Sequence, residues 1–377
     1  MNTAGASPGV RCMMMRGGTS KGLFFLAGDL PADPAERDAL LIAVLGSGHP
    51  MQVDGVGGAH PLASKVAVVC PSQRDDADVD YLFLQLGVGE ATITDRQNCG
   101  NMLAAVGPFA VERGLIPAGD ESTTTRIAMV NSGSVVTATF PTPGRTPRYD
   151  GDTAISGVPG TAAPILLRFA DTAGSATGSL LPTGKVSELI DGVKVTCVDN
   201  GMPVVVARAA DLGITGTETP DELAADAALA DRVQSLRIAA GRLMGLGDVT
   251  ALSVPKTTLV SAPRDGGTIG TRTFIPVRPH TSIGVLGAVS VATALLLPGA
   301  AGAELAGPRA GDRGDLVDIE HPAGRLTVQV SIDLAADPPA VLSSGVVRTA
   351  RKLFDGIVYP GPSAAGGPTA AGQPQTR

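Results

Sequence analysis

The chain has 377 residues, and its 44% hydrophobic and 17% charged residues exclude intrinsic disorder for most of its length. Its formal net charge is −7, so the composition offers no basic patch for a nucleic-acid partner. The 49 glycines and 29 prolines indicate many turns and close backbone approaches, and they argue against a helical bundle. At about 100–200 residues per domain, this length predicts two domains.

The hydrophobic pattern predicts an alternation of strands and a few helices. Apolar and β-branched runs bounded by glycine predict strands at both ends of 11–27, at 65–70, 81–89 and 91–94, within 125–141, at 162–170, 193–199, 203–207 and 257–262, and within 315–333. Helical spacing of apolar residues predicts helices at 34–45, 99–113, 220–244 and 283–297. For the helix at 99–113 we expect Asn98 as the N-cap and Gly114 as the C-cap.

The two halves of the chain share a loose plan of strands followed by a helix of small apolar residues, which points to an internal repeat. We therefore expect an N-terminal domain over 11–190, to which the chain end can return, and a C-terminal domain over 191–360. Residues 361–377 have low complexity and are expected to be disordered.

The cysteines and the apolar segments indicate a cytoplasmic protein. Cys12, Cys70, Cys99 and Cys197 are widely spaced and form no CxxC pair, so neither a zinc site nor a disulfide framework is expected. The first residues lack a basic segment followed by an apolar one, so no secretory signal is expected. The apolar run Ser282–Leu297 is short for a membrane span and predicts a buried central helix instead.

The usual nucleotide and hydrolase motifs are missing from the sequence. The closest approach to a phosphate-binding loop, GSLLPTGK at 178–185, departs from the motif at Thr183 and Val186. Neither a GxGxxG motif after a strand nor a GxSxG motif occurs. The four histidines are scattered, so their spacing predicts no metal site.

Cys99 is the first candidate for chemistry, because it stands at the predicted start of a helix. Unpaired backbone N–H groups and the positive end of the helix dipole stabilise a thiolate or a bound carboxylate there. Asn98, Gly100 and Asn101 add hydrogen-bond donors or room for a ligand to approach the backbone. The alternative is a buried cysteine that packs as a small hydrophobic residue.

Three further residues have both a chemical and a structural interpretation. Lys65 opens an apolar strand, where a lysine can lose its charge and serve as a base, or can simply extend its amine to solvent. Arg16, in the glycine-rich turn that also contains Lys21, suits an anion or an ordinary surface position. His280 precedes the second predicted central helix, where it could bind an anion or make structural hydrogen bonds.

Five segments together resemble one family, the PrpF family of methylaconitate isomerases and 4-oxalomesaconate tautomerases. They are MRGGTSKGLFF (15–25), DGVGGAHPLASKVAVV (54–69), NCGNMLAAVGPFAVERGLI (98–116), LPTGKVSELIDGVKVTCVDNGMPVVVA (181–207) and PHTSIGVLGAVSVATA (279–294). They follow the family's order and the resemblance covers about residues 11–360. The wording of the last segment is more similar to the oxalomesaconate enzymes.

The resemblance implies an α+β, diaminopimelate-epimerase-like fold, in which two similar α/β domains each wrap a sheet around a central helix. It implies Lys65 and Cys99 as the proton-transfer pair. It also implies a set of substrate-binding residues, namely Arg16, Gly17, Gly18, Thr19, Ser20, Lys21, Gly57, Gly58, Ala59, Asn98, Gly100, Asn101, His280 and Ser282. Epimerases of this fold carry a cysteine in each half, and the second half here has none near Ser282–Val285, which argues against a two-thiol racemase.

The activity implied is proton-transfer isomerisation of an unsaturated tricarboxylic acid, as a 1,3-allylic isomerase or a keto–enol tautomerase, without metal or organic cofactor. The substrate expected first is 4-oxalomesaconate in aromatic-acid breakdown. The alternatives are cis–trans isomerisation of 2-methylaconitate in the methylcitrate pathway and a non-catalytic accessory protein that binds polycarboxylates. A homodimer is compatible with this fold, and no membrane partner is expected.

Overall fold

The computed structural model describes residues 9–96, 99–308 and 316–361. Asn98 and most of the predicted 361–377 tail lie outside these residues. The chain forms two compact units, of which unit 1 comprises 1–117, 127–134 and 351–377, and unit 2 comprises 118–126 and 135–350. The position after residue 190 lies inside unit 2, in the turn between two paired strands, and residues 351–361 belong to unit 1.

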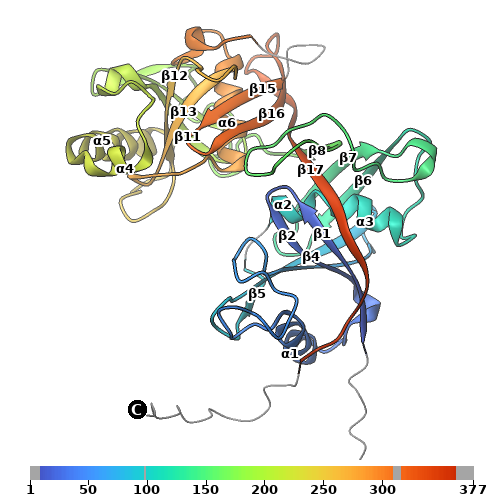
Figure 1. Ribbon diagram of the computed structural model, residues 1–377. Coiled ribbons are helices and arrows are strands. Elements are labelled where there is room, and N and C mark those ends of the chain that lie inside the picture. The colour runs from blue at the N-terminus through green and yellow to red at the C-terminus, as the bar shows by residue number, and fades with distance from the viewer. Residues whose placement is uncertain (1–8, 97–98, 309–315, 362–377) are drawn as a thin grey trace, which may run out of the picture. The chain divides into compact units, whose positions relative to one another are not determined.

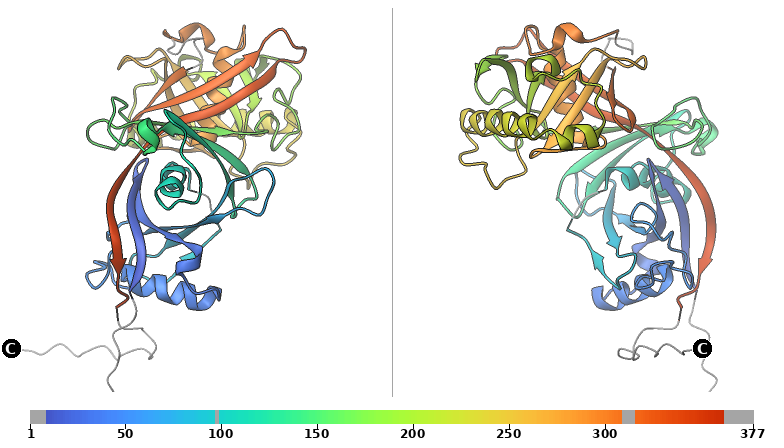
Figure 2. Two further views of the ribbon diagram at one scale, coloured as in Figure 1. Left: turned by 90° about the vertical axis from the view of Figure 1, so that its right-hand side faces the viewer. Right: turned by 60° about the vertical axis from the view of Figure 1, so that its left-hand side comes forward.

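Unit 1 is built on a sheet with a helical segment against it (Figures 1 and 2). Its elements are β1 (Val10–Gly17), β2 (Ser20–Leu26), η1 (Ala27–Asp29), α1 (Pro34–Leu45), β3 (Lys65–Pro71), β4 (Val79–Leu86), β5 (Ile93–Thr94), α2 (Gly100–Leu103), α3 (Val106–Glu112) and the end of β6 (Ser122–Met129). β1 and β2 are antiparallel, β2 and β3 parallel, β3 and β4 antiparallel, and β4 and β6 parallel. α2 packs on β1 and β2, and α3 packs on β3.

The predicted helix at 99–113 is interrupted between α2 and α3. Pro108 has no N–H to donate to the carbonyl of Ala104, and its ring crowds that carbonyl, so the regular helix breaks at this turn. The C-terminal end of this helical segment lies close to the predicted one. Arg113 is the C-cap of α3, and Gly114 takes φ +70° immediately after it.

Unit 2 contains most of the remaining strands and the longest helices. Its elements are β7 (Val135–Pro141), η2 (Pro143–Arg145), β8 (Pro164–Phe169), β9 (Glu188–Ile190), β10 (Val193–Asp199), β11 (Pro203–Arg208), η3 (Ala209–Leu212), α4 (Pro220–Ala225), α5 (Ala227–Leu243), β12 (Lys256–Ser261), β13 (Ile269–Ile275), β14 (Arg278–Pro279), α6 (Val285–Leu296), η4 (Ala303–Leu305), β15 (Leu316–His321), β16 (Gly324–Asp333) and β17 (Ala340–Val358). The long strand β17 leaves unit 2 after Ala350 and continues in unit 1 (Figure 1).

Unit 2 repeats the strand order of unit 1. β10 and β11 are antiparallel, β11 and β12 parallel, β12 and β13 antiparallel, and β13 and β15 parallel. A helical segment precedes the third strand of each series, α1 in unit 1 and α4–α5 in unit 2, and another precedes the last strand, α2–α3 and α6. The third strands, β3 and β12, begin with Lys65 and Lys256 respectively.

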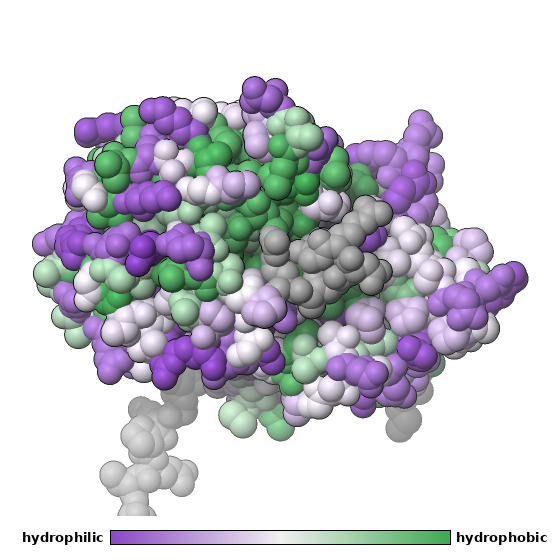
Figure 3. Space-filling view, turned by 90° about the horizontal axis from the view of Figure 1, so that it is seen from above, coloured by the Kyte–Doolittle hydropathy of each residue, from purple (hydrophilic) through white to green (hydrophobic). Residues whose placement is uncertain are grey.

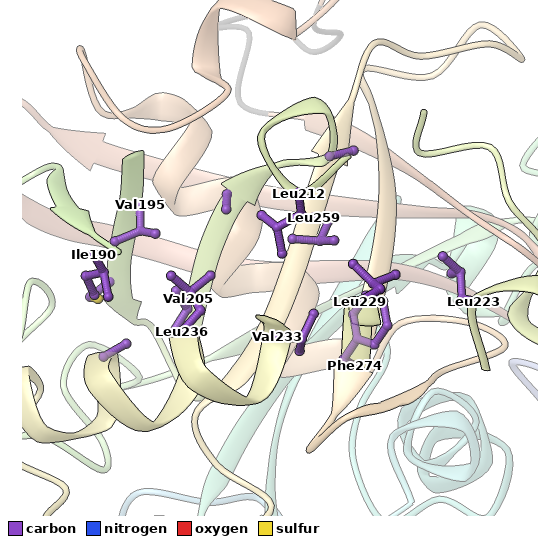
Figure 4. Packing of buried hydrophobic residues seen from close by; sticks show 14 of the residues in the cluster. Ile190, Val195, Val205, Leu212, Leu223, Leu229, Val233, Leu236, Leu259 and Phe274 are labelled. Carbon is purple, nitrogen blue, oxygen red and sulfur yellow. The ribbon is translucent and has the colours of Figure 1, made fainter. Parts of the chain in front are cut away.

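The sheet in unit 2 lies between two helical layers. Side chains that alternate along its strands reach opposite faces. One face, with Val205 and Leu259, packs on Val233 and Leu236 of α5 (Figure 4). The other face packs on α6, in which every residue from Gly287 to Leu295 is buried, as predicted for this apolar run. The predicted helix over 220–244 is divided by Asp226, which is extended and caps α5 by accepting from Leu229 N.

Candidate active site

The glycine-rich turn between β1 and β2 packs directly on the start of α2. A Cβ on Gly17 would lie 2.3 Å from the carbonyl oxygen of Asn101, and one on Gly18 would lie 2.2 Å from Asn101 Oδ1. Asn101 Nδ2 in turn donates to Thr19 Oγ1 at 3.0 Å. The structure therefore brings the predicted GGT and CGN segments together, and the missing side chains of these two glycines make room for protein atoms.

The second glycine-rich loop is arranged around the buried side chain of Gln52. Gln52 Oε1 accepts from Ala59 N at 2.8 Å and from Ser64 Oγ at 2.7 Å, and a Cβ on Gly57 would collide with it at 2.3 Å. A Cβ on Gly58 would likewise lie 2.3 Å from Ala63 Cβ. This loop leads into β3, so Gln52 helps to fix the backbone immediately before Lys65.

Lys65 is the best-defined chemical group of unit 1. Its side chain is largely buried, and Nζ donates to Gln85 Oε1 at 2.5 Å and lies 5.0 Å from the ring centroid of Phe83. Burial lowers the pKa of Lys65 because it disfavours the ammonium form, and a negative charge on Cys99 opposes that shift. A lysine with a lowered pKa is suited to accept a proton.

Gln85 is a residue that the sequence did not single out. Its Nε2 donates to the carbonyl oxygens of Ser64 and Leu86 at 3.0 and 3.1 Å, so its Oε1 is turned towards Lys65. The β3–β4 register places the two residues directly opposite each other. The signal in the sequence is weak, a polar residue within the apolar run YLFLQL, because its partner lies 20 positions earlier.

Cys99 is the N-cap of α2 and is partly buried, and no side chain of the described residues caps this helix. The buried hydroxyl of Tyr81 donates to the Cys99 carbonyl at 3.3 Å. Burial raises the pKa of Tyr81 well above its usual value, and a negative charge on Cys99 raises it further, so Tyr81 stays a neutral donor. Next to Cys99, Gly100 is open towards the described residues, since a Cβ there would meet none of their atoms within 4 Å.

The other predicted residues of the first turn have different surroundings. Arg16 Nη1 donates to Gly18 O at 2.9 Å, and both burial and the positive charge of Arg351 lower the pKa of Arg16. Ser20 is buried, and its hydroxyl has no hydrogen-bond partner among the described residues. Lys21 is half-buried, and its backbone N–H donates to Leu62 O at 2.8 Å.

In unit 2, His280 and Ser282 are neighbours of a residue that the sequence did not indicate. Ser282 N donates to His280 Nδ1 at 2.9 Å, and Ser282 Oγ lies 3.4 Å from His321 Nε2. Burial first, and then the charges of His280, Arg348 and Arg272, lower the pKa of His321 to about 4. His321 Nδ1 is buried without a partner among the described residues.

Arg348 is a further residue in this part of unit 2 that the sequence did not indicate. Burial lowers its pKa to about 10, and its guanidinium donates to Val347 O at 3.1 Å. The nearby acid Glu320 is already satisfied by backbone N–H groups of Arg264, Asp265 and Gly267. The corner near Ser282 is therefore rich in cationic groups.

Surface composition by itself does not locate the site. In Figure 3 hydrophilic residues predominate along the rim of the face, with patches of hydrophobic residues between them. The described residues contain no group of three or more His, Cys, Asp or Glu side chains suited to a metal ion. Of the helices in the described ranges, none has both the length and the apolar composition to cross a bilayer.

Comparison with known proteins identifies the family. The model of the PrpF protein family matches residues 9–360. The chain is a member of the PrpF family. It is 56% identical over 348 residues to the (4E)-oxalomesaconate Delta-isomerase of Novosphingobium sp. (strain KA1), with 92% of this chain and 96% of the relative covered. It is 53% identical over 359 residues to the 4-oxalomesaconate tautomerase of Pseudomonas putida, with 95% and 98% covered.

A solved structure to which the chain is similar is that of methylitaconate-delta-isomerase. That structure superposes with a TM-score of 0.84 at 32% identity, over 98% of this chain and 100% of the other. The mixed α/β fold and the isomerase class predicted from the sequence are confirmed by these relatives. The individual site residues stay predictions.

Proposed function

We propose that this PrpF protein catalyses 1,3-allylic isomerisation of 4-oxalomesaconate, with Lys65 as the base and Cys99 as a proton donor or helper. The observation that carries the proposal is the buried Lys65 amine, whose pKa is lowered and which lies close enough to Cys99 for their charges to interact. The identities of 56% and 53% to enzymes named for oxalomesaconate favour this substrate over others.

The proposed reaction needs no net change in electrons. The neutral amine removes a proton from a carbon next to the conjugated system, and the C–H electrons spread over a dienolate. A proton then adds to the third carbon of the allylic system, so one C–H bond breaks, another forms and the double bond moves.

Charge that develops on the dienolate and its carboxylates requires donors that are already in place. The turn around Arg16 and Thr19, held on Asn101, is proposed to supply them in unit 1. The open position at Gly100 leaves room for a ligand beside Cys99.

For the architecture, we propose the diaminopimelate-epimerase-like arrangement of two similar halves. The repeated strand order of the two units supports it.

The test is a proton NMR time course of purified protein with 4-oxalomesaconate in D₂O. Migration of the double bond with deuterium at one carbon is the expected result. If 4-oxalomesaconate stays unchanged while 2-methylaconitate is isomerised, the substrate assignment is wrong and the isomerase class stands. If neither acid changes or takes up deuterium, the catalytic proposal fails and a polycarboxylate-binding accessory protein becomes the better account.

A further inference from the structure

Lys256 occupies the place in unit 2 that Lys65 occupies in unit 1. Each lysine is the first residue of the third strand in its series, and each of these strands is parallel to the second and antiparallel to the fourth. In unit 1 the lysine is near Cys99, the N-cap of α2. In unit 2 the Lys256 amine lies 3.5 Å from the position of a Cβ on Gly284, the N-cap of α6.

The surroundings of the two amines differ. Lys65 has an acceptor in Gln85, which stands opposite it in the register. The β12–β13 register pairs Thr257 with Phe274, so one residue further it places the apolar Ile275 opposite Lys256. The Lys256 amine makes no hydrogen bond or ion pair to any side chain or carbonyl in the described parts of the chain, and burial lowers its pKa.

A half-buried ammonium without a protein acceptor loses part of its hydration, and an anion that joins it replaces the interaction that is lost. The N-terminus of a helix carries a partial positive charge, and the N–H groups of its first turn have no intrahelical acceptor. α6 has 12 residues, and no side chain caps it. Arg348 adds a positive charge near His321, which neighbours Ser282, and His321 Nδ1 lacks a partner among the described residues.

We propose that Lys256 is a second functional lysine, whose amine binds a carboxylate group of the polycarboxylic acid together with the N–H groups of Val285–Gly287. The inference rests on the proposed function for the class of acid and assigns Lys256 a binding role. Gly284 suits this role because a Cβ there would contact the amine at 3.5 Å, so the glycine leaves this side of the amine open. A carboxylate that joins the amine forms charge-assisted hydrogen bonds and favours the ammonium form of the lysine.

The experiment is calorimetric titration of the full chain with tricarballylate, a saturated tricarboxylate that cannot isomerise. Lys256→Met is expected to raise the Kd by about tenfold or more, since a hydrogen bond to a charged group is lost. Lys256→Arg keeps the charge and is expected to retain most of the affinity. Lys194→Met, which removes an exposed lysine on β10, is the matched control and should bind as the wild type does.

A second measurement uses the wild-type chain, so that it does not depend on the folding of a variant. Reductive ¹³C-methylation followed by mass spectrometry reports the reactivity of each lysine. Tricarballylate is expected to protect Lys256 and not Lys194. Unchanged affinity in Lys256→Met, or no protection of Lys256 at tricarballylate concentrations that saturate the protein, would overturn the proposal.

These outcomes separate the inference from the proposed function. Normal turnover of 4-oxalomesaconate with an unaltered KM in Lys256→Met would remove the binding role and leave the isomerase intact. Tricarballylate binding that depends on Lys256, without turnover of any acid by the wild type, would keep the binding role and remove the isomerase.

Discussion

The lysine at the start of β3 and the lysine at the start of β12 have the same place in a repeated strand order but different neighbours. Lys65 has an amide acceptor, an aromatic ring and a nearby thiol. Lys256 has a glycine beside its amine and no acceptor in the part of the chain that the structure describes. The comparison teaches that the partners of a buried amine, more than its position, determine what it can do.

The partners explain a division of labour between the two lysines. At Lys65, Gln85 stabilises the ammonium after a proton has been accepted, and the Cys99 thiol can exchange a proton nearby. At Lys256 no group of the described chain neutralises the charge. A carboxylate of the ligand therefore has no protein acceptor to displace when it pairs with this amine. On this account proton transfer belongs to Lys65 and carboxylate binding to Lys256.

The largest effect is expected from Lys65→Met. This substitution keeps an apolar stem of similar length and removes the base, so kcat should fall about a thousandfold. Steady-state kinetics beside Lys194→Met check this, and circular dichroism verifies that both variants fold. Retention of more than a tenth of the wild-type kcat would exclude Lys65 as the base.

Gln85→Glu should reduce activity at neutral pH by about tenfold or more, because a carboxylate beside Lys65 raises the pKa of the amine. A base works when neutral, so the rising limb of the pH–rate profile should move to higher pH in this variant. Gln85→Met removes the acceptor and should move the same limb to lower pH. Profiles that coincide with the wild type would show that Gln85 does not position or tune Lys65.

Gly17, which packs on Asn101, and Gly100, which follows Cys99, should respond differently to substitution by alanine. In Gly17→Ala the new Cβ meets the Asn101 backbone at 2.3 Å, so the free energy of unfolding should fall by about 1–3 kcal/mol. In Gly100→Ala the new Cβ meets nothing within 4 Å, so stability should stay within about 0.5 kcal/mol and an effect should appear in KM. Urea unfolding and kinetics on both variants test this contrast.

The smallest effect concerns the cationic corner of unit 2. Burial and neighbouring positive charges hold the pKa of His321 at about 4, against 6.5 for an ordinary histidine. Between these values the unfolded chain binds a proton that the folded chain does not, so stability falls as the pH falls from 6.5 towards 4. In His321→Asn, the loss of unfolding free energy between pH 6.5 and pH 4 should be smaller by about 1–3 kcal/mol, as measured by urea unfolding at several pH values. An equal slope in both proteins would contradict the assignment.

Local sequence signals predicted the elements that have local causes. α1 runs over Pro34–Leu45 as predicted, because Asp33 caps it and Gly46 ends it. The resemblance directed attention to Lys65 and Cys99, and the structure places them near each other. The family prediction was confirmed over nearly the whole chain.

Features that depend on distant partners could not be predicted. Gln85, His321 and Arg348 acquire their surroundings from residues far away in the sequence, and no motif marks them. β17 was missed because most of its later residues are exposed on both faces, so no alternation of apolar residues signals a strand. Lys256 gained an interpretation only when the strand order of the two units could be compared.

The most direct test of the division of labour measures two quantities in Lys65→Met and Lys256→Met. One is solvent deuterium uptake into 4-oxalomesaconate at saturating substrate, and the other is tricarballylate affinity. The account predicts that Lys65→Met loses deuterium uptake and still binds tricarballylate, whereas Lys256→Met binds it about tenfold more weakly and retains uptake. Loss of uptake in Lys256→Met at saturation, with full uptake in Lys65→Met, would contradict the roles assigned to the two lysines.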